Sequence, residues 1–196
     1  QVQFRRTSQL RSSSDELGVF FRTVLRENDV NPDSITEVAI CCVVPDLLYS
    51  LRACCQKYFD LDPLVLRPGV KTGLKIYYRD PKEVGADRIA NAVAACDLYG
   101  GPTVVVDFGT GNNFDVISEN GEFLGGAIAP GIEISLEALF GRAAALGAIE
   151  LVEPRNVIGK STVESLQSGA VYGFTAQIDG MVDRFRSELG SCTVVA

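Results

Sequence analysis

The sequence contains no histidine and no tryptophan, and it has a single methionine. The lack of histidine excludes a Ser-His or Cys-His nucleophilic pair and disfavours a zinc site, because imidazole is a common partner in both. Six cysteines are present without any CxxC motif, and two pairs are adjacent, Cys41-Cys42 and Cys54-Cys55. Because all six lie in apolar runs, we interpret them as small buried thiols kept reduced in the cytosol.

Long hydrophobic runs are also missing, since none approaches the roughly 20 residues that cross a bilayer. The N-terminus shows no signal-peptide pattern. The formal net charge of −7 argues against nonspecific binding to nucleic acid or to an anionic membrane. With 196 residues, 46% hydrophobic and 22% charged, the chain fits one large or two small globular domains. We therefore expect a cytoplasmic protein with neither nucleic acid nor membrane as a partner.

Strand and helix patterns alternate along the chain, which is typical of an α/β fold with a mixed sheet. Ser13 and Glu16 have the spacing of a helix capping box, and Pro45 suits the first position of a second helix. Helices are also predicted over 81–98, 132–146 and 162–189. Strands are predicted over 1–7, 38–44, 64–66, 103–107, 123–128 and 192–196. The outermost strands begin or stop inside apolar runs, so we expect the native protein to continue beyond both ends.

Two aspartates occupy costly positions. Asp107 ends the apolar run Val104-Val-Val106, where a carboxylate needs a partner or a bound cation. Asp87 lies near the start of a predicted helix, where the helix dipole favours an anion. Each has an ordinary interpretation, because Asp is common in tight hairpins and an Asp-Arg pair is common on surfaces.

The stretch Asp107-Phe-Gly109-Thr110-Gly111 is suited to bind phosphate. Its glycines permit close backbone approach, Thr110 adds a hydroxyl group, and Asp107 could hold a cation that bridges phosphate oxygens. Neither the GxxxxGK[ST] nor the GxGxxG motif occurs. Combined with Asp87 as a proton acceptor, this turn supplies what phosphoryl transfer to a hydroxyl group requires.

Several blocks resemble type III pantothenate kinase, in order and in spacing. They are Val70-Lys-Thr-Gly-Leu74, the run from Asp80 through Gly85-Ala-Asp-Arg88 to Ala95, Asp107-Phe-Gly-Thr110, Leu124-Gly-Gly-Ala-Ile-Ala-Pro-Gly-Ile132 and Gly159-Lys-Ser-Thr-Val-Glu-Ser165. The resemblance covers nearly the whole chain. It implies the actin-like ATPase superfamily fold, with two ribonuclease H-like halves, here 1–100 and 101–196. It also implies ATP-dependent phosphorylation of pantothenate, the first step towards coenzyme A.

The resemblance also implies roles for individual residues. Asp87 matches the proton acceptor, and Asp107 matches the ligand of a monovalent cation, potassium or ammonium, while magnesium would accompany ATP. Thr110 matches an ATP contact. The pantothenate contacts are Tyr78, Gly85, Ala86, Asp87, Arg88 and Thr162. Family members are homodimers. From the residues alone, Tyr78 also suits half-buried packing and Thr162 a helix N-cap.

The chain departs from the family pattern in three places. The family's first Asp-x-Gly-Asn-Thr hairpin precedes the start of this chain, and its Thr-Gly-Gly motif would follow the end. Where the family usually has Ala-Thr-Thr, this chain has Gly111-Asn112-Asn113, which reshapes the phosphate turn. Two alternatives therefore stay open, a non-catalytic homologue acting as a regulatory or scaffold dimer and a related sugar or acetate kinase.

Overall fold

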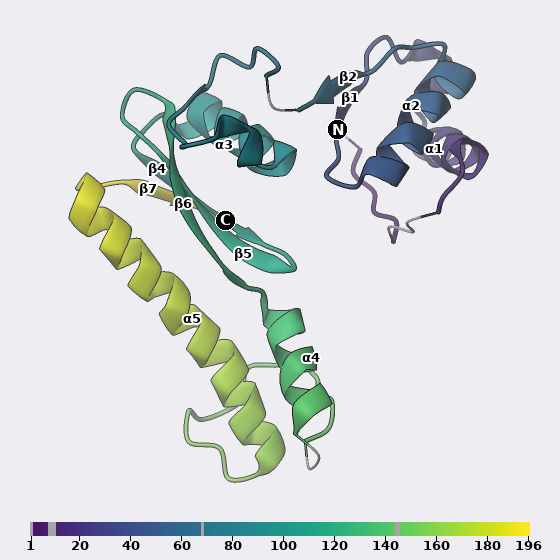
Figure 1. Cartoon of the computed structure of the whole chain (residues 1–196). Helices are drawn as coiled ribbons and strands as arrows, with labels where there is room; N and C mark the ends of the chain where they lie inside the picture. The colour runs from purple at the N-terminus through teal and green to yellow at the C-terminus, as the bar shows by residue number, and fades with distance from the viewer. Residues whose placement is uncertain (1, 8–10, 68, 144–145) are drawn as a thin grey trace. The chain divides into compact units, whose positions relative to one another are not determined.

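The computed structural model describes residues 2–7, 11–67, 69–143 and 146–196 (Figure 1). It contains two compact units. The first comprises Gln1–Lys71 with Lys82–Ala90, and the second comprises Thr72–Pro81 with Asn91–Ala196. Each unit has its own sheet and is described by itself. The division into halves at residue 100 stays a prediction. Among the described residues, no helix is both long and apolar enough to cross a bilayer.

The first unit is built on two packed helices, α1 (Ser14–Glu27) and α2 (Pro45–Phe59). The capping box is confirmed, because Ser13 Oγ accepts from the Glu16 backbone N–H while Glu16 Oε2 accepts from the Ser13 backbone N–H. Pro45 takes the first position of α2, as predicted. The buried side chains of these helices are those of Leu17, Cys54 and Cys55.

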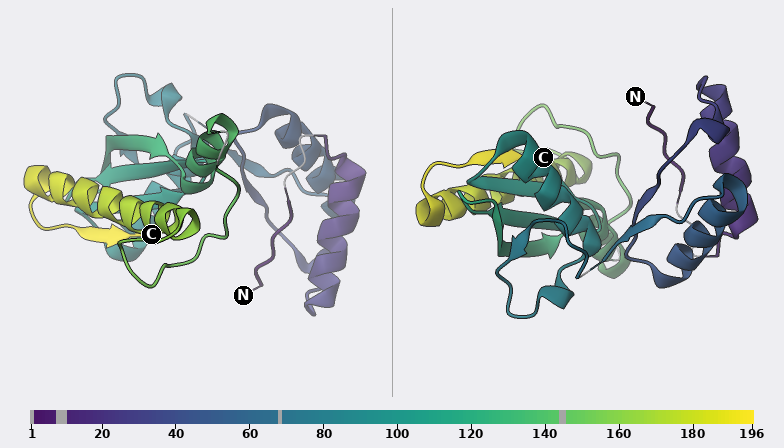
Figure 2. Two further views of the ribbon diagram at one scale, coloured as in Figure 1. Left: turned by 90° about the horizontal axis from the view of Figure 1, so that it is seen from below. Right: turned by 90° about the horizontal axis from the view of Figure 1, so that it is seen from above.

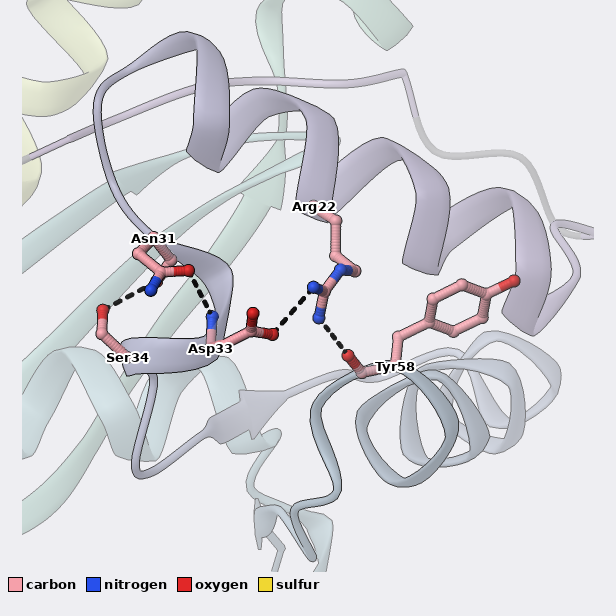
Figure 3. Close-up of polar contacts among 5 residues, drawn as sticks. All are labelled: Arg22, Asn31, Asp33, Ser34 and Tyr58. Carbon is pink, nitrogen blue, oxygen red and sulfur yellow. Dashed lines mark hydrogen bonds and ion pairs between the residues drawn. The ribbon is translucent and has the colours of Figure 1, made fainter.

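Arg22 joins three segments of the first unit (Figure 3). Its Nη2 donates to Asp33 Oδ1 at 2.8 Å, and its Nη1 donates to the backbone oxygen of Tyr58 at 2.8 Å. Asp33 lies in the short helix η1 (Pro32–Ser34), which Asn31 caps by accepting from the Asp33 backbone N–H. The guanidinium therefore ties α1 both to η1 and to the last turn of α2.

The sheet of the first unit is smaller than the sequence predicts. Strand β1 (Ala39–Cys41) pairs in parallel with β2 (Leu64–Leu66), and Ile40 is the buried residue of β1. The prediction of a near-continuous buried strand over 38–44 is wrong, because this described sheet has two strands and leaves alternate positions exposed. Residues 2–7 form no strand either; Phe4 instead packs edge-on against Phe20 of α1.

The second unit contains a five-stranded mixed sheet, seen from two sides in Figure 2. The order of its strands is β3-β6-β5-β4-β7. The strands are β3 (Lys75–Ile76), β4 (Thr103–Phe108), β5 (Gly111–Ile117), β6 (Glu122–Pro130) and β7 (Thr193–Val195). β4, β5 and β6 are antiparallel neighbours, whereas β7 runs parallel to β4. The predicted strands over 103–107 and 123–128 are confirmed.

The register of β4 on β5 gives the sheet two different faces. Val104 and Val106 pair with Val116 and Phe114, respectively, and these four residues form an apolar face. This face packs on α5 (Thr162–Leu189), where the ring centroids of Phe114 and Phe185 are 6.1 Å apart. The pairs Val105–Asp115 and Asp107–Asn113 lie on the opposite face because side chains alternate along a strand. That face meets the part of α3 (Ala86–Tyr99) that begins at Asn91.

Several predicted boundaries differ in the second half of the chain. The helix predicted over 81–98 is divided into η2 (Pro81–Glu83) and α3, with Val84 and Gly85 between them. The helix predicted over 132–146 is α4 (Ile132–Arg142), and residues 144–145 lie outside the described residues. α5 is continuous through Gly173, which costs about 1 kcal/mol relative to Ala but breaks no packing. Strand β7 is mostly exposed, not buried as predicted.

The cysteines are less uniformly buried than the sequence predicts. Cys54 and Cys55 are buried, and their burial raises the pKa of both thiols, that of Cys54 to about 11. Cys41 is exposed, while Cys42, Cys96 and Cys192 are half-buried. The difference arises because apolar neighbours in sequence do not bury a thiol unless another element covers its face.

Candidate functional site

Four of the predicted site residues lie at the start of α3 in the first unit: Gly85 precedes the helix, and Ala86, Asp87 and Arg88 are its first three residues. Asp87 is half-buried, and its Oδ1 accepts from the backbone N–H of Arg88 at 2.9 Å. A Cβ atom on Gly85 would overlap this same oxygen, so glycine at 85 leaves room for the carboxylate. Ala86 and Arg88 are buried, at 6% exposure each. The start of the helix therefore presents one carboxylate in a defined orientation, within the positive end of the helix dipole.

Cys41, at the end of β1, is an electrostatic neighbour of Asp87. Partial burial raises the pKa of the Cys41 thiol, and the negative charge of Asp87 raises that pKa further. Val43 lies near the same place, with Cγ1 at 4.0 Å from the position of a Cβ on Gly85. The surroundings of Asp87 in the first unit therefore include the end of an apolar strand.

The predicted phosphate turn is a tight hairpin in the second unit, as the sequence predicts. β4 ends at Phe108 and β5 begins at Gly111, which leaves Gly109 and Thr110 to form the turn between them. The Gly109 N–H already donates to the carbonyl oxygen of Gly111 at 3.2 Å, so it does not point freely at an anion. Thr110 is exposed. The turn can therefore offer the hydroxyl group of Thr110, but not the backbone N–H of Gly109.

Gly131 holds this turn from the other side. Its backbone N–H donates to the carbonyl oxygen of Thr110 at 2.8 Å. A Cβ on Gly131 would overlap the carbonyl oxygen of Gly109 and approach that of Thr110 to 2.7 Å. Gly126, within β6, also lies close to a neighbouring strand, because a Cβ there would overlap the carbonyl oxygen of Phe114.

Asp107 lies one residue before the end of β4, half-buried on the face that α3 covers. Its Oδ2 accepts from Asn91 Nδ2 at 3.1 Å. No Lys or Arg forms an ion pair with Asp107 within the described parts of the chain. Asn91 and Asp107 both line a cavity of about 290 Å³, whose other walls include Ala94, Ala95 and Val105. The carboxylate is therefore oriented by a neutral donor while its charge is not paired with a cationic side chain.

The unusual Gly111-Asn112-Asn113 segment belongs to strand β5 and not to the turn. Asn112 is 1% exposed on the α5 face, with its Nδ2 lacking a hydrogen-bond partner among the described residues. Asn113 pairs with Asp107 and so shares its face. The turn therefore consists of Gly109 and Thr110 and includes none of these three residues. Of the three, Asn113 is the one that pairs with Asp107.

Tyr78 and Thr162 lie at two other places in the second unit. The ring of Tyr78 is half-buried and packs 6.3 Å from that of Phe123, beside Gly125 of β6. Thr162 is exposed as the first residue of α5. The alternative that Thr162 is the N-cap is wrong, because Ser161 is the N-cap and accepts from the Glu164 backbone N–H at 3.2 Å.

The carboxylate of Asp107 is the type of ligand that hard cations prefer, because such ions bind oxygen atoms. No group of three or more His, Cys, Asp or Glu side chains able to hold a metal occurs among the described residues. Asp107 is thus suited to supply one charged ligand, with the remaining ligands coming from backbone, nucleotide or water.

Sequence reasoning missed two residues that position the site, Asn91 and Gly131. Asn91 follows Asp87 by four residues on α3, a spacing that places both on one helix face and could have drawn attention to it. No local pattern identifies Gly131, because its contact partners lie about twenty residues earlier in the chain.

Comparison with known proteins gives one consistent family. The family model described as "Type III pantothenate kinase" matches residues 1–184. The protein of that name from Salinispora arenicola is 52% identical to this chain, over 94% of this chain and 72% of the relative. The one from Acidothermus cellulolyticus is 50% identical, over 98% of this chain and 75% of the relative. The protein of the same name from Legionella pneumophila strain Corby is 48% identical over 96% of this chain and 73% of its own length.

The fold resembles that of a protein of known structure. It is a conserved protein from Campylobacter jejuni described as a member of the Baf family of transcriptional activators. The two structures superpose with a TM-score of 0.50 over 76% of this chain and 65% of the other, at 24% sequence identity. At this level of identity the likeness concerns the fold alone.

Proposed function

Because the chain belongs to the type III pantothenate kinase family, we propose that it transfers the γ-phosphoryl group of ATP to the hydroxyl group of pantothenate, giving 4'-phosphopantothenate. This reaction is the first step of coenzyme A biosynthesis. The observation that carries the proposal is about 50% identity, over 94 to 98% of the chain, to several proteins of that name. The comparisons give no support to a non-catalytic dimer or to a sugar or acetate kinase.

In this proposal Asp87 accepts the proton of the pantothenate hydroxyl group. Its half-buried carboxylate at the start of α3 supports the role, because Gly85 leaves room for it and the Arg88 backbone N–H orients it. Gly85, Ala86 and Arg88 complete the pantothenate site, with Tyr78 and Thr162 as further contacts. Tyr78 packs its ring against that of Phe123, and in this proposal its hydroxyl group bonds to the substrate.

On the nucleotide side, Asp107 binds a monovalent cation, potassium or ammonium, and Thr110 contacts ATP. The role of Asp107 is supported by its hydrogen bond to the neutral side chain of Asn91, because a Lys or Arg partner would already neutralise the carboxylate. The exposed hydroxyl group of Thr110 supports its role at the turn. A divalent cation, magnesium, accompanies ATP and offsets the charge of the phosphates. Positioning and charge stabilisation supply most of the rate enhancement in such transfers.

We further propose two ribonuclease H-like halves of the actin-like ATPase superfamily, a homodimer and a cytoplasmic location. The order of elements from β4 onward supports the fold: three antiparallel strands, two helices, and then a strand parallel to β4. The homodimer and the location rest on the family alone.

The decisive experiment compares the full-length protein with Asp87→Asn in the phosphorylation of pantothenate by ATP, with potassium and magnesium present. Formation of 4'-phosphopantothenate is followed by mass spectrometry and release of ADP by a coupled assay. Loss of a general base typically lowers the rate by about 10²- to 10⁴-fold, which is the expected effect. Asp97→Asn, an exposed residue on the same helix, serves as the matched control and should be fully active.

Equal activity of wild type and Asp87→Asn would refute the proton-acceptor role. A full-length protein that forms no 4'-phosphopantothenate would refute the kinase proposal itself.

A further inference from the structure

Asn91 connects helix α3 to the carboxylate of Asp107, and nothing in the sequence motifs assigns it a role. Its Nδ2 donates to Asp107 Oδ2 at 3.1 Å, across the gap between α3 and β4 in the second unit. An ionised carboxylate accepts hydrogen bonds and donates none, so the amide must turn its nitrogen towards Asp107. The contact therefore fixes the orientation of both groups.

The surroundings make this contact specific. The residues of α3 that line the cavity beside Asp107 are Asn91, Ala94, Ala95, Leu98 and Tyr99, which follow helical spacing. Asn91 and Tyr99 are the two polar residues in that set, and the hydrogen bond to Asp107 comes from Asn91. In a partly apolar cavity a hydrogen bond to a charged group is stronger than in water.

The chemical type of the donor matters as much as its position. A Lys or Arg at 91 would pair with Asp107 and neutralise its charge, whereas an amide satisfies one oxygen and leaves the negative charge for another cation. An apolar residue at 91 would leave a half-buried carboxylate oxygen without this hydrogen bond, which is unfavourable. Asparagine is thus a residue that orients the carboxylate without competing for it.

We propose that Asn91 is a positioning residue for monovalent-cation binding, acting by holding the Asp107 carboxylate in its ligating orientation. The inference rests on the proposed function, in which Asp107 binds that cation. Asn91 touches neither substrate in this proposal; it acts through Asp107. Because Asp87 lies one helical turn earlier on α3, the same helix carries the proposed proton acceptor and the group that positions the cation ligand.

The test measures cation binding without relying on turnover. The midpoint of thermal unfolding of the full-length protein is followed against KCl, with a non-hydrolysable ATP analogue present and with tetramethylammonium chloride keeping the ionic strength constant. For Asn91→Ala the half-saturating K⁺ concentration should rise about tenfold, which corresponds to loss of one hydrogen bond of typical strength. Asn156→Ala, which removes an exposed amide from a loop, is the control and should leave the K⁺ midpoint unchanged.

A second variant separates positioning from a merely structural role. Asn91→Asp places two carboxylates side by side, so this variant should be less stable than wild type without K⁺ and more strongly stabilised by K⁺. A residue that only fills space would lower stability equally at all K⁺ concentrations. Kinetic assays of Asn91→Ala should show activity recovered by high K⁺, with the KM for pantothenate unchanged.

Asp107→Asn distinguishes the failure of this inference from the failure of its premise. If Asp107→Asn abolishes stabilisation by K⁺ and Asn91→Ala leaves the K⁺ midpoint at the wild-type value, the role of Asn91 is refuted. If wild type and Asp107→Asn respond to K⁺ alike, the cation role of Asp107 is refuted, and the inference with it.

Discussion

The backbone N–H of Gly131 donates to the carbonyl oxygen of Thr110 at 2.8 Å, which fastens the end of strand β6 to the turn between β4 and β5. The contact requires a glycine, because a Cβ at 131 would overlap the carbonyl oxygen of Gly109. The shape of the turn that carries Thr110 therefore depends on a residue twenty-one positions later in the chain.

Gly131→Ala should displace the turn and weaken ATP binding. We expect a loss of about 1–3 kcal/mol in the free energy of unfolding, as for other insertions into closely packed sites. The KM for ATP should rise more than the KM for pantothenate, which steady-state kinetics with each substrate varied in turn will determine. Gly141→Ala is the control: it lies in α4 with open space around it, and it should stabilise the protein slightly. Unchanged ATP kinetics in Gly131→Ala would contradict the importance of this contact.

Ser13→Ala should destabilise the first unit by about 1 kcal/mol, because it removes the side-chain cap of α1. The hydroxyl group accepts from the Glu16 backbone N–H at 3.2 Å. Urea unfolding followed by circular dichroism measures the change. Ser187→Ala, at an exposed position within α5, is matched in chemistry and should change stability by less than about 0.5 kcal/mol. Similar effects of the two substitutions would argue against a role for the cap.

Arg22→Ala should cost more stability than Asp33→Ala. Removing the guanidinium breaks two hydrogen bonds, to Asp33 and to the Tyr58 backbone oxygen, whereas removing the exposed carboxylate breaks one. We expect about 1–3 kcal/mol for Arg22→Ala and less than about 1 kcal/mol for Asp33→Ala. Arg22→Lys should recover little, since an ammonium group cannot reproduce the planar two-donor arrangement. Chemical denaturation of the three variants gives the comparison, and equal losses for both alanine variants would refute the double role of Arg22.

The buried thiol of Cys54 should make stability fall as the solution becomes alkaline. Burial raises the pKa of Cys54 from its ordinary value of 9.0 to about 11 in the folded protein. The folded state therefore keeps the thiol proton up to a higher pH than the unfolded state does. The resulting stability is fully present below pH 9 and is lost as the pH rises towards 11, by an amount on the order of 2 kcal/mol.

The contribution of Cys54 is measured as a difference, because Lys57 and Tyr58 have raised pKa values and respond in the same range. Urea unfolding at pH 8.5 and pH 11 should show a smaller loss of stability for Cys54→Ala than for wild type. Cys192 is half-buried and far from Cys54 in sequence, so Cys192→Ala is the control. Its loss of stability between the two pH values should equal that of wild type. An identical pH dependence in Cys54→Ala and wild type would exclude this thiol as a source.

The local elements were largely predictable because their signals are local. Ser13 and Glu16 bond to each other across one helical turn, and Pro45 needs only its own fixed backbone angle. The hairpin around Gly109 and Thr110 was likewise predicted from the adjacent glycines and the apolar run of β4. Burial was predicted less well: Cys41 and β7 are apolar in sequence yet exposed, because burial depends on which element covers a face.

The amino-acid sequence was sufficient to identify the family, the two carboxylates Asp87 and Asp107, and the turn that carries Thr110. These features depend on residue type and on spacing along the chain. The partners of those groups became visible in the folded units: Asn91 on Asp107, Gly131 on Thr110, and Gly85 leaving space for Asp87. Asn91 and Asp107 are sixteen positions apart, and Thr110 and Gly131 are twenty-one apart. Such contacts depend on how a helix face meets a strand, or how one strand end meets a turn, and no single stretch of sequence specifies that geometry.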